Sequence, residues 1–357
     1  MKIYIIFFIK LFFRSLFYVL TVSISLVFIL NFLGELDFFQ KINVGPYFTM
    51  FLAFLNSPIF IFDMFPFIFI VTTQLFFIKL FSNNELVTFK YSGLKNSRII
   101  IIICSFTFIT GLIIISLFYN ISSNLKNFYL ELKSPYTTDG KYLAVITKNG
   151  LWVRDKVKNN TLIINASIID ENYMINSFIT EFDSEFNIIR NIMSNKIDIS
   201  KNEWLIYDAK VYKKNEYQLY ELLKIQTNFN LKKINSLYSN LNSLNIFELY
   251  QLRKNYKKLN YSIVEVDLQL LKLATLPLFL VFMTLFSSLI MLRVKHLSSV
   301  TFKISLGLFF SVIIYYLNNF FFVLGGTEKL SVYGSIFTPL LIIALSNTLL
   351  LNRINDK

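Results

Sequence analysis

The residue types that usually carry catalysis or hold a metal are sparse and scattered in this chain. Its single histidine, His296, stands in a basic stretch without a Cys, Asp or Glu close in sequence, so no metal site is predicted there. Its single cysteine, Cys104, lies within an apolar run and cannot form an intramolecular disulfide. The sequence has no G-x-x-x-x-G-K-[ST], G-x-S-x-G or H-E-x-x-H motif. We therefore expect no catalytic residue, metal or cofactor in this chain, and any energy it uses must come from another subunit.

A short polar stretch between two apolar runs, residues 82–93, has the pattern of an isolated helix. It begins Ser-Asn-Asn-Glu, a capping box in which the Ser82 hydroxyl and the Glu85 carboxylate would satisfy backbone donors at a helix start. Gly93 is the residue type that most often follows a helix end, because glycine accepts a left-handed backbone conformation. The sequence therefore predicts a helix of about two turns.

Apolar side chains on this predicted helix are expected to be exposed. Leu86 and Phe89 share one side of the helix, and Tyr91 lies on another. Exposed apolar groups imply a surface that covers them. Two surfaces fit the pattern: the lipid interface, along which the helix would lie, or a groove on another protein, into which it would dock.

Long apolar runs dominate the rest of the chain. Of its 357 residues, 55% are hydrophobic and 17% aromatic, and the mean hydropathy is +0.55, which is typical of an integral membrane protein. A bilayer core of about 30 Å requires about 20 apolar residues per helix. This criterion predicts six membrane spans, at residues 12–34, 50–78, 98–118, 271–292, 303–324 and 332–351.

Basic side chains mark one side of the membrane. Lys and Arg are concentrated before the first span, between the second and third, between the fourth and fifth, and after the sixth. The two other short connections, which hold Glu35 and Glu328, are not net basic. The positive-inside rule therefore predicts cytoplasmic N- and C-termini. It places residues 82–93 in the cytoplasm and residues 119–270 outside.

The long outer segment has the pattern of a β domain followed by a helix. Short runs of alternating or β-branched residues are separated by Asn, Asp, Ser, Gly and Lys, which predicts an antiparallel sandwich or jelly roll. The runs are "KYLAVITKNGLWVRD", "NTLIINASII", "SFITEFD", "FNIIRNIMSNKIDI", "EWLIYDAKVYK" and "QLYELLKIQTNF". After them, residues 242–259 change to a helical period, with Ile246, Leu249, Tyr250 and Leu252 on one side.

Four stretches resemble the LptF/LptG permease family of the lipopolysaccharide export system. "SPIFIFDMFPF" is similar to the start of the family's second span, and "NELVTFKYSGLKNSRI" is similar to its coupling helix. "NGLWVRD" resembles the start of the β domain on the LptG side of the family, and "ISLGLFFSVIIYYLNNFFFVLGG" resembles the fifth span. The resemblance covers essentially the whole chain, and Gly150-Leu151-Trp152 favours LptG over LptF.

The fold implied is an α-helical integral membrane protein with six transmembrane helices plus an all-β, jelly-roll-like periplasmic domain inserted between helices 3 and 4. Residues 1–118 would hold the first three helices, with the coupling helix at 82–93. Residues 119–270 would form the periplasmic domain and its connecting helix, and residues 271–357 would form the last three spans.

The resemblance also implies a function and partners. The chain would be the permease subunit of an ATP-binding-cassette exporter in the inner membrane, taking lipopolysaccharide from the outer leaflet toward a periplasmic bridge and the outer membrane. Its partners would be a cytoplasmic LptB ATPase dimer that uses ATP, the permease LptF, the bridge protein LptC and lipopolysaccharide, with no nucleic acid. The coupling helix would seat in the ATPase, with Glu85 facing a basic partner and Leu86, Phe89 and Tyr91 in its groove.

Candidate lipid contacts come from the same resemblance, with departures from the family pattern. They are Asn31, Lys41, Lys272, Asn318 and Asn319. The family often has basic residues toward the outer end of the first span, where this chain has Asn31 and reaches Lys41 only later. An acidic residue often found in the fifth span is replaced by Asn318 or Asn319. Lys272 is either a phosphate contact or a side chain that extends its ammonium to the interface. The departures indicate an unusual lipid head group.

Three alternatives to an LptG-type permease are open at this point. The chain could be the LptF-type partner permease, or a permease for a different envelope lipid. It could also be a membrane-anchored sensor or scaffold, a periplasmic binding protein that transports nothing. A sensor would normally carry a cytoplasmic signalling domain, and none of the predicted inner segments exceeds about 20 residues.

Overall fold

The structure is a computed structural model, and it divides into two compact units. One comprises Met1–Tyr129 with Val264–Lys357, and the other comprises Leu130–Ile263. These boundaries differ from the predicted ones at 119 and 271. The residues described are 3–40, 42, 44–136, 151–157, 159–170, 172–213, 216–231, 234, 240–259, 262–294 and 299–355. Lys41, Gly150 and His296, which the sequence singled out, lie outside them, as does most of the first predicted strand.

Six helices in the described residues are long and apolar enough to cross a membrane, which confirms the predicted number of spans. They are α1 (Ile3–Phe39), α2 (Pro46–Ser82), the continuous helix from Asn96 to Tyr136, α8 (Val264–Arg293), α9 (Val300–Gly326) and α10 (Val332–Asn355). All begin earlier or end later than predicted. With 37 residues each, α1 and α2 are about 55 Å long at 1.5 Å per residue, well over a bilayer core.

The third long helix changes its winding part-way. It consists of α4 (Asn96–Ile113), a π-helical segment η1 (Ile114–Tyr119) and α5 (Asn120–Lys133). A short 3₁₀ turn, η2 (Ser134–Tyr136), follows. The prediction ended this span at residue 118 because α5 is polar on one side, and that polarity does not interrupt the helix.

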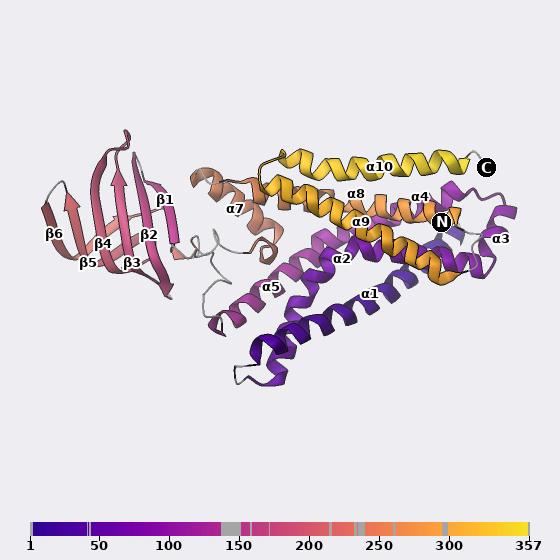
Figure 1. The fold of residues 1–357 in the computed structure, drawn as a ribbon, viewed down its shortest axis with the longest axis horizontal. Helices are drawn as coiled ribbons and strands as arrows, with labels where there is room; N and C mark the ends of the chain where they lie inside the picture. Colours follow the sequence, from indigo (N-terminus) through magenta and orange to yellow (C-terminus); the bar gives the residue numbers. More distant parts are fainter. Residues whose placement is uncertain are drawn as a thin grey trace. The chain divides into compact units, whose positions relative to one another are not determined.

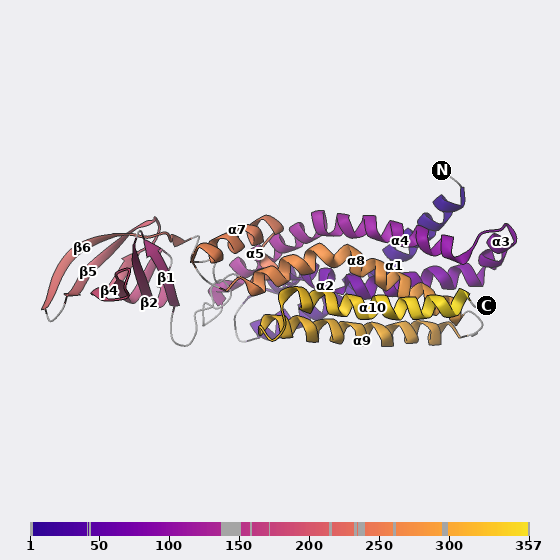
Figure 2. The same ribbon diagram turned by 90° about the horizontal axis from the view of Figure 1, so that it is seen from above.

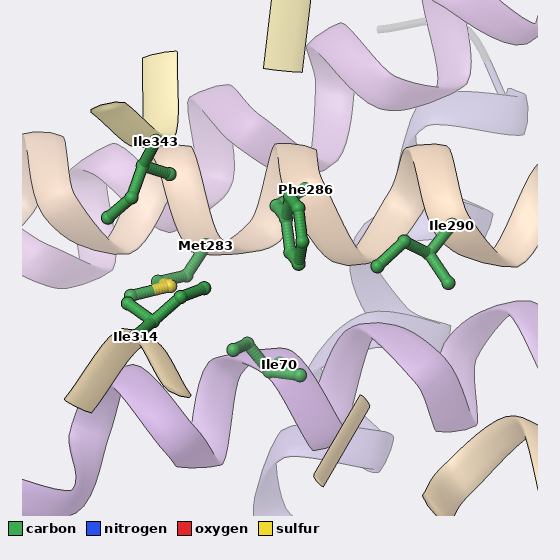
Figure 3. Close-up of a cluster of buried hydrophobic side chains, with 6 residues drawn as sticks. All are labelled: Ile70, Met283, Phe286, Ile290, Ile314 and Ile343. Carbon is green, nitrogen blue, oxygen red and sulfur yellow. The ribbon is translucent and has the colours of Figure 1, made fainter. Parts of the chain in front are cut away.

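Helices α2 and α8 form the centre of this unit. Their most apolar stretches are 61% and 67% buried, against 22% for both α1 and α9. Figure 1 shows α9 and α10 running beside α8. A cluster of buried apolar side chains from α2, α8, α9 and α10 joins these helices in Figure 3: Ile70, Met283, Phe286, Ile290, Ile314 and Ile343.

Close contacts between polar or small residues also hold α8 in place. The Ser287 hydroxyl donates to the carbonyl of Ile70 on α2 (3.0 Å), where side chains from both helices are buried. On α4, a Cβ at Gly111 would lie 2.9 Å from the Cα of Pro277, so only glycine fits at this crossing. Small residues that allow backbones to approach are typical of helix packing in membranes.

The described residues of the second unit form a six-stranded antiparallel sheet. Its strands are β1 (Leu151–Val157), β2 (Asn160–Asp170), β3 (Tyr173–Phe182), β4 (Ile188–Asp198), β5 (Glu203–Lys213) and β6 (Glu216–Gln226). Each strand pairs with the next one in sequence. The all-β domain between the third and fourth long helices is thus confirmed. The pairings of the described strands form a simple meander that curves (Figure 2), and they lack the crossed connections of a jelly roll.

Two buried polar contacts fix the segment after β6. The Asp155 carboxylate on β1 is fully buried and accepts hydrogen bonds from the backbone N–H and the side-chain amide of Asn228, both at 2.8 Å. The indole N–H of Trp204 on β5 donates to the carbonyl of Phe229 at 2.9 Å. The chain therefore returns across the sheet from its last strand to its first.

The predicted amphipathic helix is present as α7 (Ile246–Leu259). It starts with a reciprocal capping box, in which the backbone N–H of Glu248 donates to Asn245 and that of Asn245 donates to Glu248, both at 2.9 Å. Leu249 and Leu252 are buried as predicted, but Tyr250 is exposed, so the buried side of α7 is narrower than the sequence suggested.

Candidate functional site

The polar stretch between the second and third spans forms a short helix, α3 (Glu85–Tyr91). The capping box predicted at its start is wrong. Ser82 is the last residue of α2, and its hydroxyl donates to the carbonyl of Lys79 (3.1 Å). Asn84 precedes α3 in a left-handed conformation (φ 55°). Because α2 runs to Ser82, only two residues turn the chain, and Ser82 cannot reach the first turn of α3.

The end of α3 follows the prediction. Gly93 has φ +81° and donates its backbone N–H to the carbonyl of Lys90 (2.9 Å), while Leu94 donates to Phe89 (3.0 Å). These two bonds make a Schellman motif, which requires a left-handed residue at the position of Gly93.

The apolar side of α3 packs within the chain. Leu86 is only 5% exposed, so the prediction that it faces outward is wrong. The Phe89 ring lies 5.5 Å from that of Phe7 and 4.8 Å from that of Phe8, both on α1. Tyr91 is 89% exposed, as predicted. The surface that α3 offers to another molecule therefore consists of Tyr91 and its neighbours, and excludes Leu86.

Glu85 lies at the junction of α2 and α3. One of its carboxylate oxygens accepts a hydrogen bond from the side-chain amide of Asn83 (3.3 Å). The other oxygen is covered and has no hydrogen-bond partner within the part of the chain that the structure describes. The carboxylate thus retains an acceptor that a basic group could use if the covering side chains moved.

A cavity of about 900 Å³ lies among α1, α2, α8, α9 and α10. It brings together four of the five residues that the sequence nominated as lipid contacts: Asn31, Lys272, Asn318 and Asn319. The fifth, Lys41, lies outside the described residues. Residues more than 280 positions apart in sequence therefore line the same cavity.

One end of the cavity is polar. The Lys272 ammonium lies 3.0 Å from a carboxylate oxygen of Asp63, and 5.7 Å from the centre of the Phe322 ring. Counted at 1.5 Å per residue, Asp63 lies about 28 Å from the end of α2 and Lys272 about 31 Å from the end of α8. Along the helix axes, Asp63 and Lys272 therefore lie at about the same height. That height is about the thickness of a bilayer core from the ends of α2 and α8 next to α3.

The cavity is apolar toward the end next to α3. Lining residues that follow Asp63 on α2 and Lys272 on α8, or precede Asn31 on α1, are almost all hydrophobic: Leu26, Val27, Phe67, Ile70, Phe279 and Met283. A long molecule with a polar head and apolar tails fits this arrangement, with its head at the level of Lys272.

A hydrogen-bonded chain of side chains adjoins the polar end. Asn56 donates from its amide to Asn31 (3.0 Å), and Lys126 on α5 donates to Asn56 (2.7 Å). Nearby, the Tyr129 hydroxyl donates to the buried Glu35 carboxylate (2.7 Å). These bonds connect α1, α2 and α5 next to the polar end of the cavity.

Over residues 6–353, the sequence matches the family described as lipopolysaccharide export system permease LptF/LptG. The chain belongs to the LptF/LptG family. No curated protein matches the chain. Membership confirms the resemblance seen in the short motifs, and with the six apolar helices it makes the chain a multi-pass inner-membrane protein. An LptF/LptG chain is a transporter subunit and not a catalytic enzyme, and the match covers LptF and LptG alike.

For this LptF/LptG chain, sequence reasoning missed two features of the site. It did not find Asp63 as the partner of Lys272, because 209 positions separate them and nothing in the local pattern of either residue points to the other. It also missed Phe7 and Phe8, which lie in an apolar run and have no distinguishing spacing. An isolated acid at the centre of a predicted span was the one available signal for Asp63.

Proposed function

We propose that this chain is an LptG-type permease of an ATP-driven lipopolysaccharide exporter. It takes the lipid from the outer leaflet of the inner membrane and passes it toward a periplasmic bridge of β domains. The observation that carries the proposal is the cavity, which has an apolar interior and, at one end, the polar pair Asp63 and Lys272. In a chain of this family, such a cavity suits a lipid. The LptG assignment rests on the "NGLWVRD" stretch, and an LptF-type partner permease is the alternative.

The orientation proposed follows the basic residues. Lys and Arg lie at the helix ends next to α3, so that side is cytoplasmic and the sheet is periplasmic. With Ser82 and Arg293 at the inner boundary, a hydrocarbon core of about 30 Å puts Asp63 and Lys272 at the head-group level of the outer leaflet. Lipid acyl chains then lie beside Leu26, Phe67 and Phe279, which line the apolar part of the cavity and are not fully buried.

The partner permease would cover α1 and α9. These are the two least buried of the six apolar helices in the described residues, yet both line the cavity. In this chain alone they therefore enclose the lipid on one side only. Exposed residues on α1 such as Phe17 and on α9 such as Phe309 are apolar and suit either lipid or a second permease. A partner there would enclose the cavity.

Helix α3 is the proposed seat of the cytoplasmic ATPase dimer. Its outward residues, Val87, Lys90 and Tyr91, offer one basic and two apolar contacts. Its inward Phe89 packs against Phe7 and Phe8, so a push on α3 would displace α1. Because Leu26 and Asn31 of α1 line the cavity, the ATPase stroke would change the width of the lipid site.

Copurification tests the assembly. The chain is expressed with its genomic neighbours, and a bound ATPase is quantified after purification. Tyr91→Ala should lower ATPase recovery by about tenfold, because an exposed aromatic anchor at an interface is typically worth more than 1 kcal/mol. Tyr250→Ala on α7 is the matched control, since that tyrosine is also exposed on an amphipathic helix. Equal recovery with both variants would remove α3 from the ATPase interface.

Mass spectrometry of lipid that stays bound in detergent tests the substrate. Lipopolysaccharide or its lipid A part should copurify with the wild-type complex. Replacing Leu26, an exposed residue that lines the apolar part of the cavity, by Trp would narrow the cavity and should lower the retained amount. Retention of no glycolipid by the intact complex would contradict the export function and favour a permease for another lipid or a scaffold.

A further inference from the structure

Two opposite charges face the cavity side by side. Lys272 and Asp63 form a pair at 3.0 Å, and their side chains remain 32% and 39% exposed, so each keeps a free approach from the cavity. Among the described residues that line this cavity, Lys272 and Asp63 carry the charges, and the other side chains are apolar or end in a hydroxyl or amide group. The charge of this lining is therefore balanced.

A balanced pair is poorly suited to a head group that carries phosphate alone. A phosphate that approached the Lys272 ammonium would also come within a few ångströms of the Asp63 carboxylate, and like charges at that distance repel. Breaking the pair to bind the phosphate would leave a carboxylate in a partly dry site without its cation, which is costly.

A head group with both charges avoids this cost. We propose that Asp63 and Lys272 form a subsite for a zwitterionic head group, with a phosphate on Lys272 and a neighbouring ammonium on Asp63. The Asp63–Lys272 ion pair is exchanged for two new pairs, one between Lys272 and the phosphate and one between Asp63 and the ammonium. The charges of the lining are therefore balanced both before and after the lipid binds. The inference rests on the proposed function and names the head-group chemistry of the same cavity.

Neighbouring groups favour this assignment. The Phe322 ring lies 5.7 Å from the Lys272 ammonium and keeps it at the cavity wall when the carboxylate is shared. Asn318 and Asn319 line the same cavity and supply uncharged amides that hydrogen-bond to phosphate oxygens or sugar hydroxyls. The level of the pair, about 30 Å from the helix ends next to α3, matches a head group and not an acyl chain.

A phosphoethanolamine group has this chemistry, and it can belong to a phospholipid or decorate lipid A. The test is native mass spectrometry of the purified full-length chain with equimolar lipid pairs. One pair is phosphatidylethanolamine with phosphatidylglycerol. The other is lipid A with and without a phosphoethanolamine group. The wild-type chain should favour the ethanolamine-bearing member of both pairs, and Asp63→Asn should reduce that preference by up to about fivefold.

Two further variants separate recognition from folding. Glu181→Gln removes one charge of the Glu181–Arg190 pair in the sheet, so it should leave the preference unchanged. The double exchange Asp63→Lys with Lys272→Asp keeps one ammonium and one carboxylate in contact, so it should restore the preference that Asp63→Asn loses. An Asp63→Asn chain that keeps the wild-type preference, or a wild-type chain that favours the purely anionic lipids, would overturn the subsite.

The outcomes also distinguish this inference from the proposed function. If the chain binds lipid A but ignores the ethanolamine group, the subsite is wrong and lipopolysaccharide export stands. If it favours phosphatidylethanolamine and binds neither lipid A, the subsite is correct and lipopolysaccharide is not the substrate.

Discussion

Replacing Gly307 with alanine should destabilise the membrane unit, even though alanine is the better helix former. The Gln74 amide on α2 is 1% exposed and donates a hydrogen bond to the backbone carbonyl of Lys303 on α9 (2.8 Å). A Cβ at Gly307 would lie 1.8 Å from the Gln74 amide nitrogen, so the Gln74 side chain must leave its position. The hydrogen bond from Gln74 on α2 to Lys303 near the start of α9 would be lost.

The size of the effect follows from opposing terms. Alanine in a helix interior gains about 1 kcal/mol over glycine. Loss of the hydrogen bond, with a buried amide left unpaired, costs about 1–3 kcal/mol, and steric displacement adds to it. We expect a net loss of about 1–2 kcal/mol for Gly307→Ala. With Gln74→Ala already present, the clash is absent and the same change should be neutral or stabilising.

The assay is reversible unfolding of the purified chain in mixed micelles, applied to the four members of this double-mutant cycle. Gly34→Ala is the control, because a Cβ there meets no atom within 4 Å and the change should be neutral or slightly stabilising. Equal destabilisation by Gly307→Ala with and without the Gln74 side chain would refute the reasoning, since the coupling between the two positions would then be zero.

Three other changes test separate parts of the molecule. Asp155→Ala should cost about 2–3 kcal/mol because it removes the two hydrogen bonds that the buried Asp155 carboxylate accepts from Asn228, measurable as faster hydrogen exchange after β6; exchange at the wild-type rate would contradict this. Phe89→Ala should speed hydrogen exchange throughout α3 while α8 keeps its protection, because the contacts with α1 are lost; unchanged α3 exchange would show that these ring contacts do not hold α3 in place. Hydrogen bonds from Asn187 and a backbone N–H lower the pKa of Asp183 below its ordinary 3.8, so this carboxylate stabilises the β3–β4 turn above that pH and the stabilisation is lost as pH falls through the lowered pKa. Asp183→Asn should remove that acid dependence in the turn's amide chemical shifts, and an unchanged profile would assign it to another group.

Local patterns predicted the fold well where one residue type decides the outcome. The six spans follow from hydropathy, since lipid requires about 20 apolar residues whatever the neighbours are. Gly93 was predicted because a left-handed helix end favours glycine. Each of these properties is determined within one segment.

Properties that depend on distant partners could not be predicted in the same way. Leu86 is buried once the chain folds, and its neighbour Phe89 packs against α1, which lies some 80 residues earlier in the chain. The capping box failed because α2 continues through Ser82, and a four-residue pattern holds no information on where the preceding helix ends. Asp63 and Lys272 meet only when α2 and α8 pack together.

The π-helical segment at Ile114–Tyr119 determines which way the end of the third span faces. One additional residue in a helical turn rotates everything beyond it by about 100°, because 3.6 residues complete a turn. Lys126 and Tyr129 lie beyond that segment and reach Asn56 and Glu35. With regular α-helical winding they would point elsewhere, and the polar groups of α1 and α2 would face a different side of α5. The alignment of this outer polar cluster thus depends on the number of residues within the third span as much as on their chemistry. Shortening the π-helical segment by one residue would undo the alignment without altering any of the four side chains.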